Sequence, residues 1–158
     1  MRKVRQAFGG HVSILAYCLM PNHFHFLIRT EDEFRCNDFL NSYRLLLSSY
    51  TRAINKQEGR TGSLFQQNSK AKLLGGSDYA FTCFCYIHQN PLRAGLVNQL
   101  HEWEFSSFMD YVGIRGGTLC NKELCRSIIE ISEEPDTFIK ESYLAIPDEV
   151  VRDIFIKS

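Results

Sequence analysis

No stretch of this sequence is apolar for long enough to cross a membrane. Among its 158 residues, apolar runs such as Val12–Met20 end well before the roughly 18 consecutive apolar residues that a membrane-spanning helix needs. The basic N-terminal segment MRKVRQAFGG does not contain the apolar core of a signal peptide. We therefore expect no membrane partner and a cytoplasmic location.

The cysteines do not form the spacings of a disulfide scaffold or a zinc site. No Cys-x-x-Cys pair occurs among the six of them, at positions 18, 36, 83, 85, 120 and 125. Without an export signal, reduced thiols are expected. The sequence has no internal repeat or low-complexity tract, and its 44% hydrophobic and 13% aromatic residues are enough for one folded domain with a short appendage.

The net charge is zero, but the charge is unevenly distributed along the chain. Residues 1–100 contain 12 Lys and Arg against 6 Asp and Glu, whereas residues 101–158 contain 6 against 12. A basic first part and an acidic last part are expected if only the first part meets an anionic polymer. The alternative is solvated surface charge that is segregated by chance, and charge alone does not decide between the two.

Two strand-like segments flank a turn dipeptide near the N-terminus. His11–Met20 and His23–Thr30 are rich in β-branched, aromatic and other apolar residues, and Pro21–Asn22 between them is typical of a turn. The pattern predicts an antiparallel hairpin. Because side chains alternate along a strand, His23 and His25 should share one face.

The rest of the pattern predicts two longer helices, a third strand and a helical tail. A helix is expected over Phe39–Lys56, capped by Asn37 or Asp38, and a strand over Ser63–Leu74. A second helix is expected over Tyr79–Gln89, capped by Ser77 or Asp78 and ending near Asn90 before Pro91. The aromatic segment Trp103–Tyr111 should pack on the core, and short helices should follow in 120–158, with breaks at Pro135 and Pro147. This order predicts an α+β fold, an antiparallel sheet with helices packed on it.

Two histidines on one strand face can direct both imidazoles at a single metal ion. Imidazole suits Zn, Mn, Fe, Ni or Cu, and Mg only with help from oxygen ligands and water. The alternative is a pair of sheet histidines, His23 and His25, whose rings hydrogen-bond to backbone or water. Taken alone, the spacing favours this plainer interpretation.

Tyr86 and Asn90 are four residues apart and therefore lie on one face of the second helix. A phenol and a carboxamide side by side could serve as nucleophile and metal ligand. The alternative is a core tyrosine and a helix C-cap before a proline. His88 and Gln89 lie off this face, with Gln89 as the second choice of ligand if the helix ends differently.

Three segments in order carry a resemblance to a known family. AYCLMPNHFHFLI (16–28) resembles the HUH motif of single-tyrosine transposases, in which a hydrophobic residue separates two histidines. Together with YIHQNPLRAGLV (86–97) and WEFSS (103–107), it resembles the REP-associated tyrosine transposase branch. The resemblance covers roughly residues 10–112. We expect residues 1–112 to form the catalytic domain, with a short N-terminal part, and residues 113–158 to form an acidic helical tail.

The resemblance implies a fold, a cofactor and a reaction. The fold is a ferredoxin-like or RRM-like sheet with the HUH pair on a central strand and the catalytic tyrosine on a helix, here without the family's usual first strand and helix. His23, His25 and Asn90 match the ligands of a divalent metal, Mg or Mn. Tyr86 matches the nucleophile that cleaves single-stranded DNA, leaves a 5′-phosphotyrosine, and allows rejoining in DNA transposition or recombination.

The expected partner is single-stranded or hairpin DNA. Its backbone could follow five basic residues on or beside the elements of the site, each of which could equally be ordinary surface charge: Arg29, Arg44, Lys70, Lys72 and Arg93. Phe65 or Tyr79 could stack on bases. An exposed sheet edge left by a missing strand would favour a homodimer. The alternatives are a relative that binds DNA without cutting it and, more weakly, a hydrolytic metallonuclease.

Overall fold

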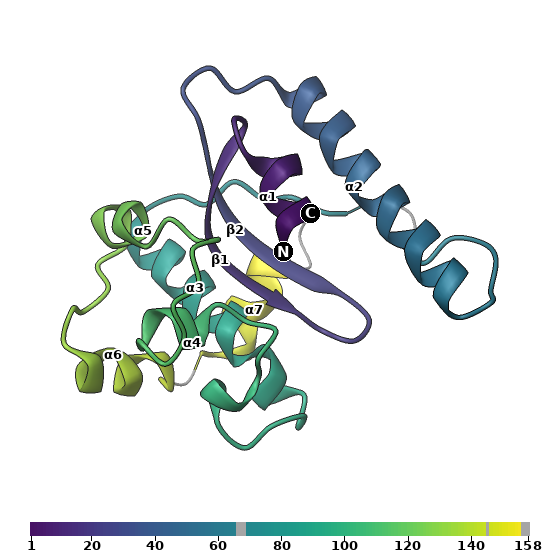
Figure 1. Ribbon diagram of the computed structural model, residues 1–158. Helices are drawn as coiled ribbons and strands as arrows, with labels where there is room; N and C mark the ends of the chain where they lie inside the picture. Colours follow the sequence, from purple (N-terminus) through teal and green to yellow (C-terminus); the bar gives the residue numbers. More distant parts are fainter. Residues whose placement is uncertain (66–68, 145, 156–158) are drawn as a thin grey trace. The chain divides into compact units, whose positions relative to one another are not determined.

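The computed structural model describes residues 1–65, 69–144 and 146–155 (Figure 1). The chain divides into two compact units. The first unit contains Met1–Ser13 and Arg29–Lys70, and the second contains Ile14–Ile28 and Ala71–Ser158. None of the helices in the described part is both long and apolar enough to span a membrane.

The predicted hairpin is present and forms the sheet. Strand β1 (Val12–Leu19) pairs with β2 (Phe24–Thr30), and the Met20 N–H donates to the His23 carbonyl (2.8 Å) to close the turn. β1 is buried on both faces, with Ala16 and Cys18 fully inaccessible to solvent. An apolar strand of this kind needs cover on both sides, and the helices of the second unit supply part of it.

Residues 105–107 lie along β1, as expected of the aromatic segment Trp103–Tyr111. Cys18 and Ser106 form an antiparallel bridge, Leu19 N–H donates to Phe105 O (2.9 Å), and Ser107 N–H donates to Tyr17 O (3.0 Å). In the described part, β1 therefore lies between β2 and this segment. His25 lies on β2, and His23 directly precedes that strand.

The third strand predicted over Ser63–Leu74 is wrong for the residues that the structure describes. Residues 63–65 and 69–74 have no regular structure, and 66–68 lie outside the described part. Leu73 is 95% exposed, and Leu64, Phe65 and Leu74 are only partly buried. The Phe65 ring lies 6.1 Å from that of Tyr50, but this packing comes without strand pairing in the described residues, and a strand needs both.

Both long helices form, with boundaries that differ from the prediction. Helix α2 (Cys36–Gln57) has Arg35 at its N-cap, and Asp38 lies in its first turn. Helix α3 (Ser77–Arg93) has Gly76 at its N-cap, with φ of 87°, a conformation that glycine adopts at little cost. Neither pair of predicted caps is therefore correct.

Helix α3 also continues through Pro91 to Arg93, where the prediction ended it near Asn90. A proline removes only its own N–H from the helix, and the next turn still closes because Ala94 N–H donates to Asn90 O (2.9 Å). The extra residues place Arg93 on the same helix as Tyr86. This extension matters for the site.

The remaining helices are short. The first unit adds α1 (Arg2–Phe8), which the sequence reading did not predict and whose Phe8 ring packs on Phe39 of α2 (centroids 5.3 Å apart). The second unit adds η1 (Leu100–Glu102), α4 (Phe108–Tyr111), α5 (Lys122–Ile128), α6 (Pro135–Ser142) and α7 (Asp148–Phe155). The expected breaks at Pro135 and Pro147 are confirmed, as is the α+β class.

The core of the second unit surrounds α3. Phe84 is fully buried, and its ring meets those of Tyr111 and Phe138 at centroid distances of 4.9 and 6.0 Å. Phe138 belongs to α6, so the C-terminal helices pack on the helix that carries Tyr86. The opposite side of that helix faces the histidines of the hairpin.

Candidate active site

The hairpin turn brings the two imidazoles together. His23 is the last residue of the turn and is exposed, whereas His25 lies on β2 and is half-buried. Their ring centroids are 4.9 Å apart, with the planes at 78°. The His23 Nδ1 atom lies 2.6 Å from Asn22 Oδ1, which fixes the orientation of the exposed ring. The alternation of the strand thus places both rings on one side.

Helix α3 presents Tyr86 and Asn90 to His25. The rings of His25 and Tyr86 are 6.1 Å apart at their centroids, and Asn90 Nδ2–H donates to the Tyr86 carbonyl (2.8 Å). Burial, followed by the neighbouring His23, lowers the pKa of His25 to about 4, while a hydrogen bond to the Asn90 side chain acts in the opposite direction. The Asn90 carboxamide therefore lies beside the His25 ring.

Arg93 completes this face of the helix. Its guanidinium carbon lies 5.6 Å from the centroid of the Tyr86 ring. Burial raises the pKa of Tyr86, and the positive charge of Arg93 partly offsets that rise. Arg93 also forms an ion pair with Asp148 of α7, at 3.0 Å. The two elements therefore bring together two imidazoles, a phenol, a carboxamide and a guanidinium within the second unit.

The segment that contains these side chains matches a known protein family. The family model described as "Transposase IS200 like" matches residues 4–90, which is more than half of the chain and includes His23, His25, Tyr86 and Asn90. The chain belongs to the IS200-like transposase family. The resemblance seen in the sequence motifs is thereby confirmed.

A curated relative extends the comparison. The chain is 26% identical over 105 residues to a Haemophilus influenzae protein named "Putative REP-associated tyrosine transposase". The match covers 60% of this IS200-like chain and 57% of the relative, so the chain spans a little over half the length of that protein. No solved structure matches.

The basic residues predicted to contact DNA are divided between the two units of this IS200-like chain. Arg29, Arg44 and Lys70 belong to the first unit, where all three are exposed. Lys72 and Arg93 belong to the second, and Lys72 Nζ donates to the Tyr79 hydroxyl (3.0 Å). Of the five, Arg93 is the residue that the structure brings to Tyr86. A role in DNA binding stays a prediction for all of them.

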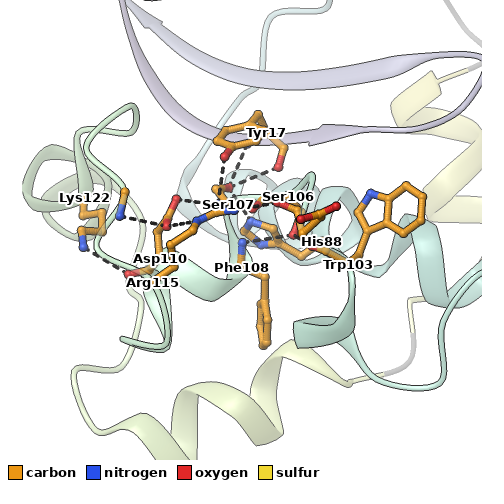
Figure 2. A network of polar contacts seen from close by, with 11 residues as sticks. Tyr17, His88, Trp103, Ser106, Ser107, Phe108, Asp110, Arg115 and Lys122 are labelled. Carbon is orange, nitrogen blue, oxygen red and sulfur yellow. Dashed lines mark hydrogen bonds and ion pairs between the residues drawn. The ribbon is translucent and has the colours of Figure 1, made fainter. Parts of the chain in front are cut away.

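Buried polar contacts hold α3 in position beneath the site (Figure 2). The His88 Nε2 atom lies 2.7 Å from Ser107 Oγ, and Ser107 in turn bonds to the backbone of Tyr17 in β1. On the same helix, Gln89 Nε2–H donates to the carbonyls of Ser142 and Leu144, at 2.8 and 3.0 Å. The second choice of ligand thus points away from the histidines, toward the C-terminal helices.

Sequence reasoning missed Ser107 and Asp148. Ser107 lies within the WEFSS segment that carried part of the family resemblance, but no local pattern shows that it bonds to a strand 90 positions earlier. Asp148 pairs with a residue 55 positions away, and nothing in its surrounding sequence distinguishes it from Glu149. Contacts across such separations come only from the fold.

The donor set at the histidines suits a divalent metal of borderline character. Two imidazoles and a carboxamide oxygen are neutral ligands, and in the described part no cluster of three or more His, Cys, Asp and Glu residues exists to add carboxylates. Mn fits imidazole and oxygen ligands together, and Mg would keep several waters. The chemistry of these side chains is compatible with the Mg or Mn that the family resemblance implies, and the assignment of His23, His25 and Asn90 as ligands stays a prediction.

Proposed function

We propose that this chain is a transposase-like enzyme that cleaves and rejoins single-stranded DNA through a covalent bond to Tyr86. The observation that supports the proposal most directly is the convergence of His23, His25, Tyr86 and Asn90 from β2, its preceding turn and α3, within the segment that matches the family. The proposed setting is DNA transposition or recombination, with single-stranded or hairpin DNA as the partner.

The chemistry follows from a phenol placed beside metal-ligating groups. The Tyr86 oxygen attacks the phosphorus of a phosphodiester, a new P–O bond forms to the phenol, and the bond to the 3′-oxygen breaks. The phenolic proton passes to water, and the released 3′-oxygen takes up a proton to become a hydroxyl. The DNA on the other side is held as a 5′-phosphotyrosine. Attack by a 3′-hydroxyl on that ester reverses the step and restores the DNA bond.

His23, His25 and Asn90 would hold a divalent Mg or Mn ion beside Tyr86. When bound, such an ion polarises the scissile phosphate and neutralises charge that develops during the displacement. The protein's own contribution is positional. Because Asn90 Nδ2–H donates to the Tyr86 backbone carbonyl, the carboxamide is oriented on the same turn of α3 that carries the phenol.

The test is a covalent-adduct assay with the full chain, Mg or Mn, and a panel of hairpin-bearing DNA oligonucleotides. A label at the 3′ end should move with the protein in a denaturing gel, while a 5′ label should be released on a shorter strand with a 3′-hydroxyl. Tyr86→Phe should abolish the adduct because it removes the attacking oxygen. Tyr50→Phe, at an exposed position on α2, is the matched control and should retain it.

Two outcomes would contradict the proposal. Cleavage that survives Tyr86→Phe would indicate water as the nucleophile and a hydrolytic enzyme. DNA binding without any adduct, under either metal and with every oligonucleotide, would favour a relative that binds hairpins and does not cut them. Binding of Mn measured by calorimetry on His23→Ala and His25→Ala tests the metal ligands separately, and unchanged affinity in both would exclude them.

A further inference from the structure

Tyr86, Asn90 and Arg93 share one face of helix α3. They are separated by four and three residues, the two spacings that bring helical side chains into contact. The Arg93 guanidinium lies over the Tyr86 ring, at 5.6 Å from its centroid. A permanent positive charge is therefore held against the proposed nucleophile by the geometry of the helix itself.

The guanidinium is at present bound to a carboxylate. Arg93 Nη2–H donates to Asp148 Oδ1 at 3.0 Å, and Asp148 lies in the first turn of α7. The Asp148 side chain is 80% exposed and that of Arg93 is 34% exposed. An ion pair so open to water is weak, and a guanidinium binds the oxygens of a phosphodiester with the same N–H groups that it uses for a carboxylate.

Three other basic side chains of the second unit, those of Arg115, Lys122 and Arg126, contact groups of the protein core. Arg115 is bound to the buried Asp110 carboxylate at 2.6 Å, and Lys122 donates to the Asp110 carbonyl. The Arg126 guanidinium lies over the Tyr111 ring. Arg93 differs from these three in two ways, since its acidic partner is exposed and its aromatic neighbour is the proposed nucleophile.

We propose that Arg93 is a phosphate-binding residue at Tyr86, and that Asp148 occupies it in the DNA-free protein as an internal substitute for the phosphodiester. Single-stranded DNA displaces the Asp148 carboxylate when its phosphate enters the site. This inference rests on the proposed function and adds to it a phosphate contact and a built-in competitor. Helix α7 thus lowers the affinity of the site for DNA through the Asp148 carboxylate.

If Asp148 competes with DNA for Arg93, removing its negative charge should raise the affinity for DNA more than removing the charge of the neighbouring Glu149. Asp148→Asn releases Arg93, while Glu149→Gln changes the net charge equally on the same exposed turn. General attraction of DNA to a less acidic protein affects both variants alike. Only displacement of the internal carboxylate distinguishes them.

The experiment measures binding of a fluorescent single-stranded oligo-dT by anisotropy, with the full chain and its variants, across a series of salt concentrations. Asp148→Asn should bind about threefold tighter than Glu149→Gln, a factor suited to a weak exposed ion pair. Arg93→Gln should weaken binding about tenfold and lower the salt slope by about 0.7, the contribution of one phosphate contact to a single strand. In the Arg93→Gln background, the two acidic variants should become equal.

The outcomes separate this inference from the proposed function. Equal affinities of Asp148→Asn and Glu149→Gln in the wild-type background overturn the competitor, and an unchanged salt slope in Arg93→Gln overturns the phosphate contact. Failure of wild type and Asp148→Asn alike to bind the oligonucleotide overturns both parts. Retained binding with no covalent adduct, in contrast, contradicts the proposed function and leaves the phosphate site standing. Melting temperatures of the variants equal to that of wild type would exclude misfolding as the cause of a change in DNA affinity.

Discussion

Acidification should destabilise the fold through His88, the residue that anchors the tyrosine-bearing helix. Ser107 Oγ donates to Tyr17 O (3.2 Å) and accepts Tyr17 N–H (2.9 Å), so its remaining lone pair accepts from His88 Nε2–H at 2.7 Å. Nε2 therefore carries a hydrogen, and burial keeps the ring neutral. Its Nδ1 atom is buried without a hydrogen-bond partner in the described part.

Protonation would place a second N–H among aromatic rings. The centroids of Phe84, Phe108 and Tyr111 lie 4.4, 5.7 and 6.0 Å from that of His88. Burial accordingly lowers the pKa of His88 to about 3, with Asp110 acting weakly in the opposite direction. Because the folded pKa lies below the unfolded value of about 6.5, the associated stability is present above pH 6.5 and is lost as the pH falls toward 3.

The size of the loss follows from the same two values. Each pH unit below the unfolded pKa costs about 1.4 kcal/mol, so at about pH 5 the free energy of unfolding should be lower by about 2 kcal/mol than at neutral pH. The assay is urea denaturation of wild type and His88→Gln at about pH 7 and about pH 5. Glutamine can still donate to Ser107 but does not titrate, so its acid-induced loss should be smaller by that amount.

The comparison isolates His88 even though other histidines titrate. His25, whose pKa burial also lowers to about 4, is present in both proteins and cancels in the difference. Equal losses for wild type and His88→Gln would refute the tautomer and the buried, unpartnered nitrogen on which the prediction rests.

Two further substitutions test the network around Asp110 shown in Figure 2. Arg115→Met should lower the free energy of unfolding by about 3 kcal/mol in urea denaturation, since it leaves the Asp110 carboxylate, 1% exposed, without its ionic partner; a loss below 1 kcal/mol would contradict a buried pair. Gly117→Ala should destabilise by about 1–3 kcal/mol, because a Cβ there would overlap the Asp110 carboxylate, and a melting temperature equal to that of wild type would show that the loop yields without cost.

The parts of the fold that the sequence predicted are those that local pattern determines. The hairpin follows from two apolar runs around Pro21–Asn22, and α2 and α3 follow from their helical periodicity. The strand expected over Ser63–Leu74 was wrong for the described residues 63–65 and 69–74, and residues 105–107 take the position beside β1. Competition between distant segments for one strand edge leaves no trace in the local sequence.

The sequence indicated the motif residues of the candidate site but not the residues that contact them. His23, His25, Tyr86 and Asn90 could be singled out because their spacing and family resemblance are local properties, and the structure brings them together; their roles stay a prediction. Asp148 was not found, since its ion pair with Arg93 depends on how α7 packs against the end of α3. That contact requires α3 to extend beyond Pro91. The prediction ended the helix before the proline, so it did not place Arg93 on α3.

The stretch from Tyr86 to Asn90 explains how a site of few residues can be held accurately. Its two ends face the histidines, while His88 and Gln89 between them turn inward and bond to Ser107 and to the carbonyls of 142 and 144. A rotation of α3 by one residue, about 100°, would break both sets of buried bonds and leave polar groups unpaired. Apolar packing alone tolerates small rotations, because one methyl group can replace another. Directional bonds on the inner face therefore define the angle at which the phenol and the carboxamide meet the imidazoles, and the residues that do this are not the ones that would touch DNA.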